Sequence, residues 1–309
     1  MKKSPVKNDD SDMSLVKLVA QYNDEEKCRA TLVKLRWPEG VKCTRCGSGE
    51  RVSKLPKGHQ WHCGGCRYKF TVTSGTIFND THLPIWKWFL AIYLMTESRK
   101  GMSANQLKRT LEVSYETAWY LCHRIRDAMQ DGNAELLNGI VEVDETYVGG
   151  KVKGMGRGYR GNKAIAMGAL QRGGEVRLQT VKTGDRKTLH DFIHSKTNDE
   201  CPAIYTDENP AYNGIADANT RHETVNHSAE EWVNGDVHTN GIESVWSLLK
   251  RSVIGTYHKI SVKHLDAYLG ELEHRFNNRN NHFLFRDTLL KLVKADSLPY
   301  RELVMKAAA

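Results

Sequence analysis

Two hydrophobic patterns divide the chain. Up to about residue 136 apolar side chains recur mainly at helical spacing, whereas the following segments alternate apolar with polar positions or are rich in β-branched residues, as strands are. The helices expected first lie at residues 15–37 (two short ones), 85–98, 103–111 and 114–129. The elements expected next are strands at 140–148, 164–170, 175–182 and 203–207, with helices at 188–194 and 242–253. This order predicts an α+β protein of several domains.

Two Cys-x-x-Cys pairs follow the first helices. Cys43 and Cys46 are separated by sixteen residues from Cys63 and Cys66, and nearby glycines permit tight turns around the sulfurs. Two such pairs can place four thiolates tetrahedrally around one Zn²⁺, which predicts a structural zinc ribbon. A thioredoxin-like redox pair is the alternative, and the lack of a surrounding βαβ pattern disfavours it.

The helices at 103–111 and 114–129 are joined by a short turn. Ser103-Ala-Asn-Gln106 is a capping box for the first helix, and Ser114 can cap the second. Helix, turn and helix is the layout of a helix-turn-helix, although plain helical packing produces it too. If the second helix reads DNA, the side chains expected on the DNA are Tyr115, Thr117, Tyr120 and Arg124.

Three acidic side chains stand out in the second part. Asp144 lies inside a strand, Asp207 ends a strand, and Glu243 lies near the start of a helix. Aspartate disfavours strands, and a buried charge is costly unless it is paired or binds a metal. Together the three carboxylates can hold two Mg²⁺ ions about 4 Å apart. Two alternatives remain open: Glu142 and Asp144 can both face water on an edge strand, and Glu243 can complete a capping box that starts at Asn240.

Charge is distributed unevenly along the chain. Of the formal charge of +8, residues 1–136 contribute 22 basic and 15 acidic side chains, and residues 137–309 contribute 23 and 22. This favours a polyanionic partner for the first part. A glycine-rich basic segment at 149–163 contains a formal GxGxxG, but it does not open a helix and so does not fit a dinucleotide site. We expect its Lys151, Lys153 and Arg157 to meet a phosphate backbone, with an inert connection as the alternative.

These motifs resemble those of bacterial insertion-sequence transposases that join an N-terminal zinc ribbon to an RNase H-like DDE domain. The resemblance covers nearly the whole chain and rests on the four cysteines, VDETYVGGK (143–151), TDENPAY (206–212) and HTNGIESVWSLLKR (238–251). It implies a zinc ribbon, a helix-turn-helix-like helical region and an RNase H-like mixed-sheet catalytic domain. The expected segments are a disordered tail (1–14), short helices (15–40), the ribbon (41–80), the helical DNA-binding region (81–136), the DDE domain (137–285) and a C-terminal helical tail (286–309).

The resemblance also implies roles for single residues. Asp144, Asp207 and Glu243 would be the catalytic acids that bind Mg²⁺ or Mn²⁺, while the cysteines bind structural Zn²⁺. DNA contacts are expected from Lys250, Arg251, His238 and Asn240. The partners would be double-stranded DNA, both terminal inverted repeats and target, and further copies of the chain in a homodimer or larger synaptic complex.

The N-terminus has no signal peptide and the longest apolar run is about half a membrane span, so we expect a cytoplasmic, nucleoid-associated protein without a membrane partner. The expected activity is strand cleavage and attack of the freed 3′-hydroxyl on target DNA. A zinc-dependent DNA-binding regulator derived from a transposase, or a Mg²⁺ nuclease without strand transfer, are the alternative functions.

Overall fold

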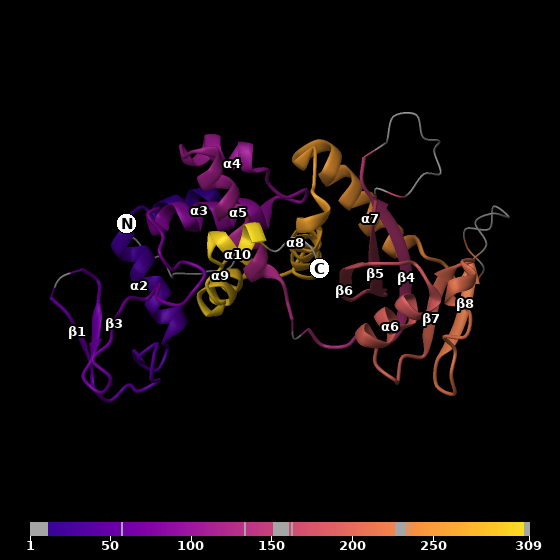
Figure 1. Cartoon of the computed structure of the whole chain (residues 1–309), viewed down its shortest axis with the longest axis horizontal. Helices are drawn as coiled ribbons and strands as arrows, with labels where there is room; N and C mark the ends of the chain where they lie inside the picture. Colours follow the sequence, from indigo (N-terminus) through magenta and orange to yellow (C-terminus); the bar gives the residue numbers. More distant parts are fainter. Residues whose placement is uncertain are drawn as a thin grey trace, which may run out of the picture. The chain divides into compact units, whose positions relative to one another are not determined.

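The chain folds into two compact units, each with its own hydrophobic core (Figure 1). A computed structural model describes residues 12–56, 58–132, 134–150, 161, 163–225, 233 and 235–305. The first unit contains the described residues up to Met129 together with Asn280–Met305, and the second contains Gln130–Arg279. Among the helices that the structure describes, none combines the length and the apolar composition needed to cross a membrane.

Two helices and a small sheet begin the first unit. They are α1 (Leu15–Gln21), α2 (Glu25–Arg36) and the antiparallel strands β1 (Val52–Lys54), β2 (Trp61–Cys63) and β3 (Lys69–Phe70). Asp24 caps α2, because its carboxylate accepts the amide of Glu26 at 3.1 Å. The ring of Trp61 contacts those of Trp37 and Phe70, with centroids 5.5 and 6.2 Å apart. This aromatic cluster joins the sheet to the end of α2.

Three further helices complete the helical region: α3 (Ile85–Glu97), α4 (Ala104–Leu111) and α5 (Tyr115–Met129). The hydroxyl of Ser103 accepts the amide of Gln106 at 3.2 Å, and that of Ser114 accepts the amide of Thr117 at 3.1 Å. Glu112 adopts a left-handed conformation, φ 52°, at the end of α4. The predicted starts of both helices and the tight turn between them are therefore confirmed.

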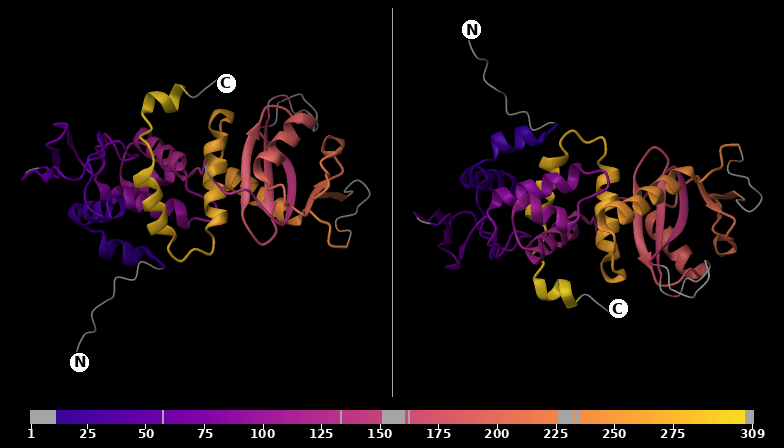
Figure 2. Two further views of the ribbon diagram at one scale, coloured as in Figure 1. Left: turned by 90° about the horizontal axis from the view of Figure 1, so that it is seen from below. Right: turned by 90° about the horizontal axis from the view of Figure 1, so that it is seen from above.

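The C-terminal helices belong to the first unit. The sequence suggested that the catalytic domain extends to residue 285, but the chain leaves the second unit after Arg279, and α9 (Leu284–Lys294) packs against α2, α3 and α5 (Figure 2). The reason is an apolar face on α9: Phe285 is 2% exposed and contacts the rings of Tyr22 and Phe89 at 6.0 and 5.9 Å. The helix α10 (Tyr300–Met305) follows.

The second unit is built on a mixed five-stranded sheet in the order β6-β5-β4-β7-β8. Its strands are β4 (Ile140–Val148), β5 (Ala164–Gln171), β6 (Val176–Val181), β7 (Ala203–Asp207) and β8 (Arg221–Val225). β5 runs antiparallel to β4 and β6, while β4, β7 and β8 are parallel. The structure thus confirms the mixed-sheet, RNase H-like fold class. Because β4 is the central strand, the interpretation of Asp144 as an edge-strand residue is wrong.

Helices cover both faces of this sheet. They are α6 (Arg186–Lys196) on one face, and α7 (Asn240–Ser252) and α8 (Leu265–Asn277) on the other, with short helical turns at Pro210–Tyr212, Val253–Tyr257 and Val262–His264. Val141 and Val143 of β4 lie in the core with α6. Gly168 of β5 lies opposite Asp144, and a Cβ there would stand 2.7 Å from side-chain atoms of Ile242 and of Trp246. The glycine therefore lets α7 lie close against the sheet.

Candidate active site

The three predicted acids lie on one face of the sheet. Side chains alternate along a strand, so Asp144 points away from the α6 core that contains its neighbour Val143. Glu142 pairs with Tyr205 across the parallel strands β4 and β7, and the same offset places Asp207 level with Asp144. The helix that carries Glu243 packs on this same face of β4 and β5. Residues far apart in the sequence are thus brought together as expected.

Asp144 lies at the centre of this site, buried and surrounded by other carboxylates. Burial, followed by the negative charges of Glu145 and Asp207 and, more weakly, of Glu243, raises the pKa of Asp144 to about 8. A carboxylate surrounded by other carboxylates and removed from water holds its proton unless a cation takes the proton's place. The charge arrangement around Asp144 is therefore one that a divalent cation would relieve.

We expect the protein to lose stability as the pH rises from about 4 to about 8 when no Mg²⁺ or Mn²⁺ is added. The folded chain keeps the Asp144 proton until its pKa of about 8, whereas the unfolded chain releases it near 3.8, so unfolding releases a proton throughout this window. Between pH 6 and pH 8 the loss should reach up to about 2 kcal/mol. Thermal unfolding at both pH values measures it. Asp144→Asn should remove the difference, and an equal loss in that variant would show that another group titrates.

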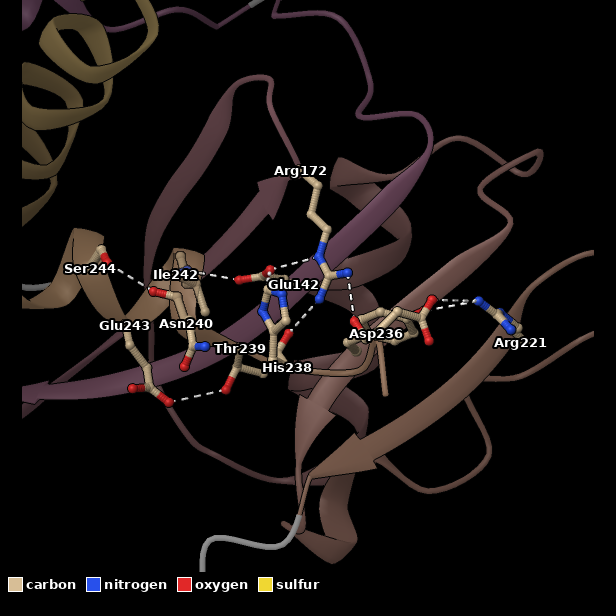
Figure 3. Close-up of polar contacts among 11 residues, drawn as sticks. Glu142, Arg172, Arg221, Asp236, His238, Thr239, Asn240, Ile242, Glu243 and Ser244 are labelled. Carbon is tan, nitrogen blue, oxygen red and sulfur yellow. Dashed lines mark hydrogen bonds and ion pairs between the residues drawn. The ribbon is translucent and has the colours of Figure 1, made fainter. Parts of the chain in front are cut away.

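Glu243 lies in the first turn of α7, where it was expected. Its Oε1 accepts the hydroxyl of Thr239 at 3.1 Å (Figure 3). The alternative, a capping box from Asn240 to Glu243, is not what the structure shows, because Asn240 is already the first helical residue and Thr239 makes no side-chain bond to the helix amides. The carboxylate of Glu243 instead accepts the hydroxyl of Thr239, the residue that precedes the helix.

Glu142, which lies on the neighbouring strand β4, caps α7. Its Oε2 accepts the amide of Ile242 at 3.0 Å, and its Oε1 accepts Nε of Arg172 at 2.8 Å (Figure 3). Nδ1 of His238 lies 3.3 Å from the same Oε1. Sequence reasoning considered Glu142 only as a water-facing residue, yet it is 1% exposed. The sequence shows only its spacing, two positions before Asp144 and so on the same strand face, and that spacing does not distinguish it from a surface acid.

Glu145 fixes the turn that follows Asp207. It accepts Nδ2 of Asn209 at 3.1 Å and the hydroxyl of Tyr212, while the amide of Asn209 donates to Oδ1 of Asp207 at 3.1 Å. Tyr212 is fully buried, and burial followed by the charge of Glu145 raises its pKa, so it stays a hydroxyl donor. Sequence reasoning did not single out these contacts, although Glu145, Asn209 and Tyr212 all fall within motifs that it quoted.

The chemistry of the acidic site fits a hard cation, and its carboxylates are widely spaced. Three carboxylates offer the oxygen ligands that Mg²⁺ and Mn²⁺ prefer. Among the residues that the structure describes, however, the four ribbon cysteines are the only group of three or more possible ligands whose atoms all lie within 4.8 Å of one another. The carboxylates of the acidic site are spaced more widely than those thiols.

The four ribbon cysteines fit one zinc ion. Sγ of Cys43 lies 3.6 Å from Sγ of Cys66, and Sγ of Cys46 lies 3.7 Å from Sγ of Cys63. Zinc–sulfur bonds of about 2.3 Å in a tetrahedron place the sulfurs about 3.8 Å apart. Although burial acts to raise the pKa of Cys43, the backbone amides of Cys46 and Arg45 lower it to about 6, which favours the thiolate that binds metal. The predicted structural zinc site is supported.

Only some of the α5 side chains that were expected to contact DNA are accessible. Tyr115 and Thr117 lie at the accessible start of α5, and Tyr115 is 43% exposed. Tyr120 donates its hydroxyl to the carbonyl of Leu298 at 2.6 Å. Arg124 is 4% exposed and donates to the carbonyl of Asn79 at 2.7 Å. Arg124 therefore lies on the inner face of α5, which corrects the expectation that it contacts DNA, whereas the half-buried Tyr120 stays a predicted contact.

The other expected DNA contacts differ in accessibility. Lys250 and Arg251 are exposed in the last turn of α7, and Asn240 is exposed in its first turn. His238 is half-buried, with Nδ1 turned toward Glu142. The loop residues Lys151, Lys153 and Arg157 lie outside the described residues.

Comparison with known families places the chain. Residues 136–277 match the ISXO2-like transposase domain, and residues 23–69 match the transposase zinc-ribbon domain. The chain is also 31% identical over 271 residues to the uncharacterized protein in transposable element ISH50 of Halobacterium salinarum, an alignment that covers 81% of this chain and 90% of that protein. The chain belongs to the ISXO2-like insertion-sequence transposases. The transposase-domain match includes all three acids, and the ribbon match includes all four cysteines.

Two solved structures are more distantly similar. The crystal structure of the Mos1 strand transfer complex shares 11% identity with a TM-score of 0.29, covering 72% of this transposase and 78% of that chain. A pre-cleavage Mos1 transpososome shares 11% identity with a TM-score of 0.28, covering 72% and 79%. Similarity at this level carries no inference about the activity of this transposase.

Proposed function

We propose that this transposase binds the terminal inverted repeats of its insertion sequence, cleaves DNA at their ends and joins the freed 3′-hydroxyl to target DNA. The supporting observation is the convergence of Asp144, Asp207 and Glu243 on one sheet face within the domain that matches the family. Burial and, after it, the neighbouring carboxylates raise the pKa of Asp144, as expected for a site that a cation would stabilise.

The three acids would hold two Mg²⁺ ions, for which Mn²⁺ can substitute. When bound, such ions activate a water or a 3′-hydroxyl and stabilise the leaving oxygen at one phosphorus. The contribution of the chain is to hold the carboxylates in place: Asp144 sits on the central strand, Asp207 is held by the amide of Asn209, and Glu243 accepts the hydroxyl of Thr239. Preorganised charge of this kind supplies much of the rate in such sites.

DNA contacts are proposed for both units. Lys250 and Arg251 are exposed on the helix that carries Glu243, so they would neutralise phosphates near the cut. The ribbon and the accessible start of α5, with Tyr115 and Thr117, would bind the repeats. His238, Asn240 and the basic loop residues Lys151, Lys153 and Arg157 remain proposed contacts. Two ends must meet before transfer, which requires a homodimer or larger synaptic complex acting on the nucleoid in the cytoplasm.

The test is a reaction of the purified full-length protein with DNA that carries the repeats of its own element and a supercoiled target. We expect end cleavage and joined products with Mg²⁺ or Mn²⁺, and neither without added divalent ion. Cleavage without joining would favour the nuclease alternative. Repeat binding without cleavage in any divalent ion would favour a DNA-binding regulator.

A further inference from the structure

One buried carboxylate connects the strand that carries Asp144 to the helix that carries Glu243. Glu142 precedes Asp144 by two residues, so both side chains lie on the same face of β4. Its Oε2 accepts the amide of Ile242, the residue next to Glu243, at 3.0 Å (Figure 3). The same carboxylate therefore sets the separation between two of the proposed metal ligands. Thr239, the residue that precedes α7, makes no side-chain bond to the helix amides.

Arg172 holds this carboxylate and the segment that leads into α7. Its Nε donates to Glu142 at 2.8 Å, and its two terminal nitrogens donate to the carbonyls of Asp236 and His238 at 2.7 and 3.0 Å (Figure 3). The guanidinium also lies 4.7 Å from the ring centre of Tyr205, which is two residues before Asp207. One planar side chain thus joins β4, β7 and the approach to α7, a geometry that the point charge of lysine does not reproduce.

We propose that Glu142 and Arg172 are positioning residues that set the divalent-ion affinity of the acidic site. The inference rests on the proposed function, since it concerns where Glu243 stands relative to Asp144 when both bind metal. Burying a charged pair is expensive unless its hydrogen-bond partners are in place, and the carboxylate of Glu142 is 1% exposed. Groups that orient metal ligands commonly change affinity by about 10- to 100-fold when altered.

Glu142→Gln tests the contact directly. A glutamine offers one oxygen and one NH₂ group, so it cannot accept both the amide of Ile242 and Nε of Arg172. In the zinc-loaded full-length protein we expect Mn²⁺, titrated by calorimetry, to bind about 10- to 100-fold more weakly. Amide hydrogen exchange of residues 240–244 should accelerate, which is a readout that does not depend on catalysis.

Gly241→Ala tests the same contact without removing a charge. A Cβ at this position would stand 2.6 Å from Oε2 of Glu142 and 2.7 Å from Cδ2 of Leu170, so the carboxylate must move. Alanine favours a helix more than glycine does, so a weaker Mn²⁺ affinity in this variant would not reflect a weaker helix. If Glu142→Gln proves too unstable to purify, Gly241→Ala still decides the question. In the double variant the two effects should be less than additive, because both act on one contact.

Glu175→Gln is the matched control. Glu175 also pairs with an arginine of the sheet, Arg177, at 2.7 Å, but it lies outside the contacts of α7. The Mn²⁺ affinity of this variant and the amide hydrogen-exchange rate of its residues 240–244 should equal those of the wild type. If Glu142→Gln and Gly241→Ala both bind Mn²⁺ as tightly as the wild type, the inference about Glu142 and Arg172 is overturned and the proposed function is not. If the wild type has no Mn²⁺ site that depends on Asp144, the proposed function is overturned.

Discussion

Replacement of Asp144 by asparagine should reduce DNA cleavage by about 1000-fold or more while DNA binding is retained. Asparagine has nearly the same shape but cannot supply the negative charge that a divalent ion requires, and losing one such preorganised charge typically costs about 10²- to 10³-fold on its own. The fold should not suffer, because the exchange removes repulsion with Glu145, Asp207 and Glu243. Single-turnover cleavage and a binding titration on repeat DNA measure the two effects.

Asp191→Asn provides the comparison for this prediction. Asp191 is exposed on α6, which covers the opposite face of the sheet, so the same chemical change should leave cleavage at the wild-type rate. If Asp144→Asn abolished DNA binding as well as cleavage, Asp144 would have a structural role. If Asp144→Asn cleaved DNA at the wild-type rate, Asp144 would not be a catalytic residue.

Cys63→Ser should release the zinc and unfold the ribbon. Serine supplies no thiolate, and three remaining sulfurs hold Zn²⁺ far more weakly; structural zinc sites contribute on the order of 10 kcal/mol to folding. Because Trp61 packs against Trp37 and Phe70, loss of the ribbon should alter tryptophan fluorescence. We expect zinc content to fall to near zero and repeat binding to be lost.

Cys28→Ser is the control for zinc content. Cys28 is also fully buried, lies outside the four-cysteine cluster, and donates its thiol to the carbonyl of Tyr22 at 3.6 Å, a partner that a serine hydroxyl can keep. This variant should retain one zinc per chain. Full zinc content in Cys63→Ser would mean that other ligands hold the metal.

Two of the three acids could be found from the sequence because each lies at a local irregularity. Asp144 interrupts a β-branched run, and Asp207 ends a strand just before a proline. The strands themselves were predictable from alternation, as the pairing of β5 with β6 around a glycine turn confirms. Patterns of this kind depend only on neighbours in the chain.

Contacts between distant residues could not be predicted in the same way. Glu142 finds its partners Arg172 and Ile242 at separations of 30 and 100 residues, so no local pattern distinguishes it from a surface acid. The same holds for Arg124, since helical spacing shows that it shares a face with Tyr120 but not that this face is covered. The partners of Arg124 and Tyr120 are 45 and 178 residues away. Tertiary packing decided both outcomes.

The most direct test of the proposed chemistry is strand transfer from pre-cleaved repeat DNA with a free 3′-hydroxyl into a supercoiled target, with Mg²⁺, by the wild type and by Glu243→Gln. This substrate bypasses the first cleavage, so it isolates the joining step. We predict joined products from the wild type and none above background from Glu243→Gln, with equal repeat binding by both. Equal joining by the two proteins would contradict the assignment of Glu243, and no joining by a wild type that binds the repeats would contradict the transfer reaction itself.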